Sequence, residues 1–204
     1  MTTRASYPVV STEVLLRGRI LSVRRDHVQM SDGSVADREI VEHPGAVGIL
    51  ALDENGEVLL VNQYRHAVGE RLDELPAGLL DVADESALDA AKRELAEEAF
   101  VTAADWHVLL DLHPSPGFSD EAIRVYLARE LSAVAEADRF EPEHEEITMT
   151  VERVPLAEAV RRALDGSMTN AAAVAGVLAA SRHQASGWSA LRPADAPWPA
   201  RPGH

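Results

Sequence analysis

Cysteine is absent from the sequence, and so is any long apolar run. Without thiols the chain forms no disulfide, no thiolate zinc site and no cysteine nucleophile. No stretch approaches the roughly 20 apolar residues that a membrane-spanning helix needs. Residues 1–10 hold no apolar segment of signal-peptide length. These absences predict a cytoplasmic protein that has no membrane partner.

Positive charge is scarce. The chain has 19 Lys and Arg residues against 34 Asp and Glu residues, which gives a net charge of −15. A surface of that sign repels nucleic acid, so we exclude nucleic acid as a partner. An acidic protein that binds an anionic nucleotide is expected to need a divalent cation between the two. The 204 residues, 46% of them hydrophobic, suffice for the core of one domain, with or without an added arm.

The order of the sequence patterns predicts a mixed α/β (α+β) fold. Residues 12–43 alternate short apolar and polar stretches around a turn signal at Asp32 and Gly33, which predicts a β hairpin. The pair Asn55 and Gly56 predicts a second hairpin between strands at residues 46–52 and 57–64. Helices are predicted over residues 86–99, 156–164 and 170–183, and further strands over 106–112, 122–128 and 147–154.

Three parts follow from this order. Residues 1–43 form a β-rich arm and residues 44–184 form the main domain. Residues 185–204 are rich in proline and small residues, so we expect a disordered or loosely packed tail there.

Three carboxylates recur at helical spacing within residues 93–98, which read RELAEE. Glu94, Glu97 and Glu98 are three and four residues apart, so they project from one face of the predicted helix. Their mutual repulsion destabilises the helix unless a cation lies among them, and hard oxygen ligands of this type suit Mg²⁺ or Mn²⁺. From spacing alone, a solvated acidic face partly neutralised by Lys92 and Arg93 explains the pattern equally well.

The longer segment, residues 78–101, resembles a Nudix box. That motif reads Gly, five residues, Glu, seven residues, Arg-Glu, an apolar residue, any residue, Glu-Glu, any residue, Gly and an apolar residue. Glu85 is followed by seven residues and then RELAEE, with Val101 as the closing apolar position. Six residues rather than five separate Gly78 from Glu85, which a loop insertion absorbs. Phe100 replaces the Gly that ends the helix, often in a left-handed conformation, so we expect strain or a rerouted exit there.

The resemblance implies a mixed β-sheet sandwiched between helices and a metal-assisted attack of water on a nucleoside diphosphate derivative. It further implies roles for individual residues. Glu94, Glu97, Glu98 and the carbonyl of Ala77 would hold the metal, Mg²⁺ or Mn²⁺, with Glu97 and Glu98 counted as catalytic. Gly78, Glu85 and Arg93 would be structural, because Arg93 would pair with a carboxylate and orient the helix.

Three further segments resemble the ADP-ribose pyrophosphatase branch of the family, namely residues 63–66, 74–81 and 115–121. The guanidinium of Arg65 suits forked contacts to a diphosphate. Glu121 suits a ribose hydroxyl or a metal, whereas His66 and His113 are expected to be surface or loop residues. The substrate-binding residues implied by the resemblance are Arg65, Glu74, Pro116, Gly117 and Glu121.

The attacking water needs a base, which this branch takes from an acidic loop after the box. We expect Glu145 to be that base, with Glu143 and Glu146 as alternatives, because a carboxylate near bound metal accepts a proton from a metal-acidified water. The products would be AMP and ribose 5-phosphate. The branch also implies a homodimer formed through the arm of residues 1–43, whose aromatic or arginine residues help to hold the adenine.

Two groups of alternatives remain open. The substrate is ADP-ribose, or else a nucleotide sugar, NADH or an oxidised nucleoside diphosphate, because all of these share the same metal helix. The other group is a binding module that senses ADP-ribose without cleaving it, which Phe100 keeps open. Against a sensor, the three helix glutamates and a candidate base are all present, and no basic DNA-binding segment is visible.

Overall fold

The computed structural model describes residues 7–138 and 148–201. The elements run in the order β1 (Val9–Arg17), β2 (Ser22–Gln29), β3 (Val35–Glu42), β4 (Ala46–Ala51), β5 (Glu57–Arg65), β6 (Glu70–Glu74), β7 (Ala77–Leu79), α1 (Ala87–Ala99), β8 (Val101–Leu112), β9 (Ile123–Ala133), a 3-10 turn (Glu136–Asp138), β10 (Thr150–Pro155), α2 (Leu156–Asp165), α3 (Ala171–Ala185) and β11 (Arg192–Pro193). No helix of the described ranges is long and apolar enough to cross a membrane.

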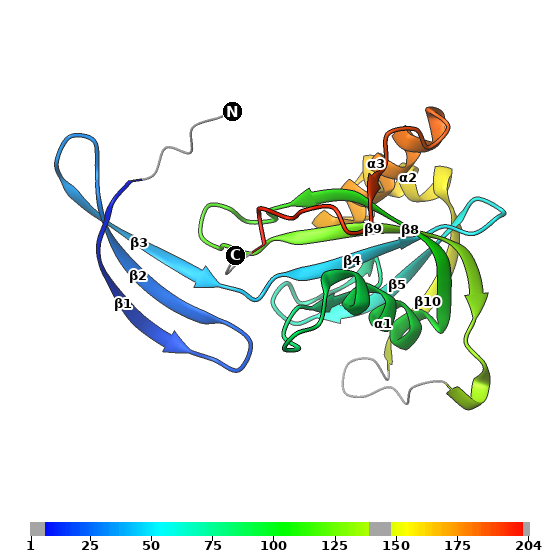
Figure 1. The fold of residues 1–204 in the computed structure, drawn as a ribbon, viewed down its shortest axis with the longest axis horizontal. Helices are drawn as coiled ribbons and strands as arrows, with labels where there is room; N and C mark the ends of the chain where they lie inside the picture. Colours follow the sequence, from blue (N-terminus) through cyan, green and yellow to red (C-terminus); the bar gives the residue numbers. More distant parts are fainter. Residues whose placement is uncertain (1–6, 139–147, 202–204) are drawn as a thin grey trace.

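The arm is an antiparallel sheet in the order β1-β2-β3. The predicted turn joins β2 to β3, where the backbone N–H of Met30 donates to Ser34 and that of Gly33 donates to Met30. In Figure 1 this sheet stands apart from the rest of the molecule, and β3 continues into β4. The β-rich arm predicted from the sequence is therefore confirmed.

Strand β4 is the centre of the main domain and is buried along its whole length. It lies in a sheet of order β11-β8-β9-β4-β7, parallel to β9 and antiparallel to β7. Its side chains alternate between two cores, because successive residues of a strand point to opposite faces. Val47 and Ile49 pack in the cluster beneath α1, whereas Leu50 packs in the cluster beneath α2 and α3. The expected sandwich of a mixed sheet between helices is confirmed.

The second hairpin prediction is wrong beyond its turn. The turn forms, since the backbone N–H of Asp53 donates to Glu57 and that of Gly56 donates to Asp53. Beyond a single bridge between Leu52 and Val58, however, β4 and β5 separate into different sheets. The reason is that both edges of β4 are taken, one by β9 and the other by β7. Strand β5 instead pairs with β10 and β6.

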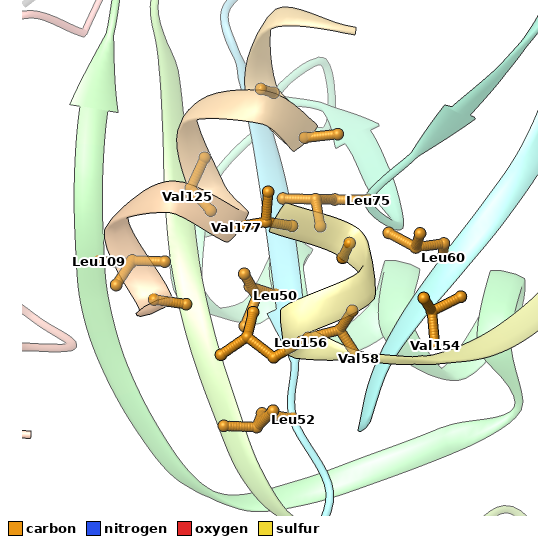
Figure 2. Packing of buried hydrophobic residues seen from close by; sticks show 14 of the residues in the cluster. Leu50, Leu52, Val58, Leu60, Leu75, Leu109, Val125, Val154, Leu156 and Val177 are labelled. Carbon is orange, nitrogen blue, oxygen red and sulfur yellow. The ribbon is translucent and has the colours of Figure 1, made fainter. Parts of the chain in front are cut away.

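Helices α2 and α3 cover the face of the sheets opposite α1 (Figures 1 and 2). The side chain of Asn170 caps α3 by accepting a hydrogen bond from the backbone N–H of Ala173 at 3.0 Å. Figure 2 shows the core between these helices and the strands, with Leu50, Val58 and Val177 at its centre. The helices predicted over residues 156–164 and 170–183 are observed with ends shifted by at most two residues.

The strand predictions for residues 106–112 and 122–128 were too short. Strands β8 and β9 pair from Val101 opposite Ala133 to Leu112 opposite Ile123, so both strands continue past their predicted ends. Polar residues such as Thr102, Asp105 and Ser132 interrupt the apolar pattern there, so the pattern does not detect these ends. The strand predicted over residues 147–154 is observed as β10, and residue 147 lies outside the described residues.

The predicted loose tail is not what the structure shows up to residue 201. Strand β11 pairs with β8, and Arg192 bridges to Asp111 at 2.7 Å. Arg124 donates to the carbonyls of Ala196 and Pro197, while its guanidinium lies 4.8 Å from the centre of the Trp198 ring. The proline-rich composition suggested that the entropy cost of ordering would leave this segment loose. Specific contacts of this kind offset that cost. We call residues 192–198 the C-terminal clasp.

Candidate active site

Helix α1 carries the three glutamates of the box and begins where the sequence predicts. The hydroxyl of its N-cap, Ser86, accepts a hydrogen bond from the backbone N–H of Asp89. Ala91 and Leu95 are fully buried against the sheet, which fixes the rotation of the helix about its axis. Glu98 is turned toward β7, where its carboxylate accepts the backbone N–H of Ala77 at 2.9 Å, and only 8% of the residue is exposed.

Gly78 lies directly against Glu94. A Cβ atom added to Gly78 would come within 2.0 Å of the Glu94 carboxylate, a distance that no real contact reaches. The box therefore needs glycine at this position because the carboxylate occupies the space of a side chain, and not because of an unusual φ angle. Glu98 thus meets Ala77 and Glu94 meets Gly78, two successive residues of β7.

Arg93 joins the remaining carboxylates. Its Nε and Nη2 atoms form a fork with Glu85 at 3.0 and 3.1 Å, and its Nη1 donates to Glu94 at 2.7 Å and to Glu97 at 3.0 Å. Hydrogen bonding to Glu85 raises the pKa of Arg93 above its ordinary value, against the effect of burial, and the charge of Glu94 raises it further. The guanidinium is the cation that offsets the repulsion between these carboxylates in the structure.

The donor set on this face suits a divalent ion in its chemistry. Glu94, Glu97 and Glu98 supply carboxylate oxygens from one helix, and Glu98 meets the backbone of Ala77. Such oxygens are the hard ligands that Mg²⁺ prefers. Within residues 7–138 and 148–201 no three acidic or histidine side chains already converge into a metal-binding group. The contacts of Arg93 account for this, since its Nη1 atom holds both Glu94 and Glu97.

Phe100 ends α1 in the left-handed conformation, with φ 54° and ψ 35°. This is the conformation that the glycine of the motif adopts readily, and it costs other residues roughly 1–2 kcal/mol. The chain leaves the helix directly into β8, and the carbonyl of Phe100 accepts the backbone N–H of Val134 at 2.9 Å. Of the two outcomes expected at Phe100, strain or rerouting, the structure shows the first.

A cavity of about 550 Å³ is lined by Ala77 and Gly78. It therefore lies next to the side of α1 that carries Glu94, Glu97 and Glu98, which we call the glutamate face. Arg65 reaches it from the end of β5 and is held by a fork to Glu74, with Nε to Oε1 at 2.9 Å and Nη2 to Oε2 at 2.6 Å. Only 2% of Glu74 is exposed, whereas 45% of the Arg65 side chain is. The charge of Glu74 is therefore buried but paired, and the guanidinium is presented at the cavity wall.

The structure brings some predicted substrate-binding residues together and separates others. Arg65, Glu74 and Glu121 line the same cavity. Pro116 and Gly117 instead line a neighbouring hollow between the 116–120 loop and the arm. Glu145 and its alternatives, Glu143 and Glu146, lie outside the described residues. His66 and His113 are exposed, as expected.

His43 is a cavity residue that the sequence reading missed, because it was placed at the end of the arm. It lies between β3 and β4, and its backbone N–H donates to Asp120 at 2.9 Å. His43 lines the same cavity as Arg65, and its Nδ1 lies 3.8 Å from Glu121. The sequence signal for it is its position just before a fully apolar strand, since residues at strand ends commonly line binding sites.

The NUDIX domain family matches residues 42–171, the segment that contains α1, β7 and the cavity. The chain belongs to the NUDIX family. Residues 8–41 match a second family, described as the nucleoside diphosphate sugar hydrolase N-terminal domain. The second match coincides with the β1-β2-β3 sheet, so the arm is also a recognised part of related proteins.

Individual relatives of this NUDIX protein agree with the assignment. The chain is 49% identical over 196 residues to the ADP-ribose pyrophosphatase of Mycobacterium tuberculosis, covering 96% of this chain and 93% of that protein. It is 36% identical over 127 residues to the ADP-ribose pyrophosphatase of Bacillus subtilis, covering 62% of this chain and 68% of that protein. A solved ADP compounds hydrolase superposes with a TM-score of 0.74 at 24% identity, covering 93% of this chain and 99% of the other, which supports the fold.

Proposed function

We propose that this NUDIX protein hydrolyses the diphosphate bond of ADP-ribose to AMP and ribose 5-phosphate. The observation that carries the proposal is the relative that is 49% identical over 96% of the chain, which is named ADP-ribose pyrophosphatase. That match spans both the arm and the NUDIX domain. The cavity beside the glutamate face supports it, because an arginine and carboxylates line one hollow there.

Mg²⁺ is the proposed cofactor, with Mn²⁺ as a substitute. Glu94, Glu97, Glu98 and the carbonyl of Ala77 would hold it, while Arg93 would keep its fork to Glu85 and release its contacts with the other carboxylates. Bound there, the ion would acidify a water and offset the charge that develops on the diphosphate. Holding Glu98 at Ala77 and Glu94 at Gly78 keeps two of the ligands in place beforehand.

Arg65 would bind the diphosphate, because a guanidinium makes forked contacts to phosphate oxygens. Both oxygens of Glu74 already accept hydrogen bonds from Arg65, so we assign Glu74 to positioning that guanidinium. Glu121 would accept a hydrogen bond from a ribose hydroxyl. Pro116 and Gly117 would shape the loop that carries Glu121. Glu145 remains the proposed base, with Glu143 and Glu146 as alternatives.

The arm is proposed to form a homodimer. Strand β1 is exposed along its whole length, although much of it is apolar. Contiguous exposed apolar residues on a water-soluble domain mark an interaction surface. A second copy of the chain is the proposed occupant, and adenine would be held by arm residues of the dimer. The exposed apolar residues of the arm are Tyr7, Val9, Val10, Val14, Leu15, Leu16, Ile20, Leu21 and Val35.

The test is product release from a panel of nucleoside diphosphate derivatives with Mg²⁺, with and without EDTA. We expect AMP from ADP-ribose at a kcat/KM well above that of nucleotide sugars, NADH and oxidised nucleoside diphosphates, and none with EDTA. Greater activity on another panel member would support metal-dependent hydrolysis but show that ADP-ribose is not the preferred substrate. A nucleotide sugar is the second candidate, because residues 8–41 match the N-terminal domain of nucleoside diphosphate sugar hydrolases.

Binding of ADP-ribose without hydrolysis of any panel member would instead support a sensor. Calorimetry with ADP-ribose in the presence of Ca²⁺, an ion of the same charge but larger size, measures binding separately from turnover. The first variant to examine in that case is Phe100→Gly, which removes the departure from the box.

A further inference from the structure

Resting on the proposed function, we propose that His43 is a substrate-contacting residue whose Nε2–H donates a hydrogen bond to a ribose hydroxyl beside Glu121. The family match and the box do not assign a role to this histidine. Three observations carry the proposal: the tautomer fixed by the backbone, the place of the ring in the cavity, and the carboxylate next to it.

The backbone fixes the tautomer of the ring. The N–H of Gly45 donates to His43 Nδ1 at 3.1 Å, so Nδ1 must present its lone pair. The proton of a neutral imidazole then lies on Nε2, which becomes a donor. No hydrogen bond to Nε2 is recorded among residues 7–138 and 148–201, so this donor is left for a ligand of the cavity.

The ring is also held in place. Only 15% of the His43 side chain is exposed, and its backbone N–H is bonded to Asp120 in the loop that carries Glu121. Gly45 lies two residues after His43, and its N–H holds the ring at Nδ1. A side chain held at the backbone and at one ring nitrogen loses little entropy when the other nitrogen binds a ligand.

The neighbouring carboxylate selects the kind of ligand group. The Glu121 carboxylate lies 3.8 Å from Nδ1 of the ring, with 26% of its side chain exposed. A phosphate oxygen beside this carboxylate would be repelled, since both groups are acceptors of like charge. A hydroxyl both donates and accepts, and neighbouring hydroxyls of a ribose match a donor and an acceptor placed side by side. Arg65, which lines the same cavity, provides the contact that a phosphate needs.

The experiment compares His43→Leu, which removes the donor, with His43→Gln, whose amide nitrogen retains one at a similar position. We expect the leucine variant to raise KM for ADP-ribose roughly tenfold, the usual effect of losing one hydrogen bond, and the glutamine variant to stay within about threefold. His183→Gln at the end of α3 is the control and should match the parent. A KM for His43→Leu within twofold of the parent, at an unchanged Tm, would overturn the proposal.

A double-mutant cycle separates a hydroxyl contact from a phosphate contact. If His43 and Glu121 bind the same sugar, the effects of His43→Leu and Glu121→Gln on KM should be non-additive, whereas His43→Leu and Arg65→Gln should add. Coupling with Arg65 in place of Glu121 would overturn the hydroxyl assignment. The cycle is run on whichever ribose-containing panel member is hydrolysed best. If that member is not ADP-ribose, the proposed substrate is wrong, but the His43 contact with a ribose hydroxyl can still be tested.

A spectroscopic measurement tests the tautomer without turnover. In protein labelled with ¹⁵N-histidine, the His43 signals should show a protonated Nε2 at neutral pH. The Nε2–H resonance should shift when the non-hydrolysable α,β-methylene analogue of ADP-ribose is added. A protonated Nδ1, or an unchanged Nε2–H at saturation, would contradict the proposal.

Discussion

Gly78 and Glu94 are in contact, with no space for a side chain between them. This contact explains why the box has glycine at position 78, which the sequence alone does not explain. Helical spacing predicted that Glu94, Glu97 and Glu98 leave one side of a helix, and residues 87–99 do form α1. The sequence did not reveal that Arg93 bonds three carboxylates at once. Helical spacing determines the direction in which side chains leave the backbone, but it does not determine which groups they hydrogen-bond.

Gly78→Ala should displace the Glu94 carboxylate, because the new methyl group takes its place. A misplacement of about 1 Å near the reacting groups can cost about 100-fold in turnover. We therefore expect kcat with saturating Mg²⁺ to fall roughly 100-fold, measured as AMP release from ADP-ribose.

Gly33→Ala is the matched control for this change. Gly33 has a φ of 85° in the arm and open space around it, so alanine there adds backbone strain without touching the site. It should lower stability by about 1 kcal/mol while leaving kcat unaltered. An unchanged kcat for Gly78→Ala would show that Glu94 has no role as a ligand.

Glu98→Gln should reduce turnover by several orders of magnitude while leaving the fold intact, and Glu97→Gln should do the same. The amide oxygen that replaces the Glu98 carboxylate can still accept the backbone N–H of Ala77, so unfolding by urea should shift little. The loss of a charged metal ligand acts on chemistry instead. Turnover within about tenfold of the parent would refute the metal assignment.

At the scale of elements, the sequence predicted the elements themselves better than their pairing. Residues 46–52 and 57–64 are strands, but the turn at Asn55 and Gly56 joins two different sheets. Local turn chemistry reports the conformation of four residues, whereas the partners of β4 come from β7 and β9, far apart in the chain. The C-terminal clasp escaped prediction for a related reason. Its order depends on Asp111 and Arg124, which lie in other strands.

Trp198→Ala should destabilise the domain through the clasp. The indole packs against the cluster beneath α1 and lies on the guanidinium of Arg124. Removing this partly buried ring should lower the free energy of unfolding by about 2 kcal/mol, measured by urea denaturation. Pro199→Ala, at an exposed neighbouring position, serves as the control. Equal stability of the two variants would mean that the clasp adds nothing to the fold.

Acid should release the same clasp. Burial raises the pKa of Asp111, but hydrogen bonds from Arg124 and Arg192 outweigh it and hold the pKa below its ordinary value of 3.8. A carboxyl whose folded pKa is depressed stabilises the fold fully above its unfolded pKa, and that stability is lost as pH falls through the folded value. The free energy of unfolding, measured by urea denaturation, should therefore fall less between pH 7 and pH 3 in Asp111→Asn than in the parent protein. A parallel loss in both proteins would exclude this carboxyl as the cause.

At the scale of the whole molecule, the order of strand and helix patterns correctly predicted a mixed α/β domain with an added β-rich arm. It could not predict how the arm is attached. Strand β3 meets the domain through backbone hydrogen bonds between Val41 and the 118–120 loop. These contacts place His43 in the cavity, so the junction belongs to the site as well as to the arm. The boundary predicted at residue 43 falls at this junction.

Leu16→Asp should convert the proposed homodimer into a monomer. Leu16 is 55% exposed on β1, and a charge there would have to be buried without a partner on association. Light scattering after size-exclusion chromatography measures the mass directly. Leu164→Asp changes an exposed leucine on α2 and should remain a dimer. A monomeric parent protein at micromolar concentration would refute the proposed dimer.

The C-terminal clasp also determines when the protein can finish folding. A ribosome releases the chain from its N-terminus at roughly 5–20 residues per second, so α1, β8 and β9 emerge several seconds before residue 198. During that interval the face around Trp106 and Tyr126 lacks part of its cover, since Ala194, Ala196 and Trp198 have not arrived. A transcript cut short before residue 192 would thus encode every glutamate of the box and still leave this apolar face open to aggregation.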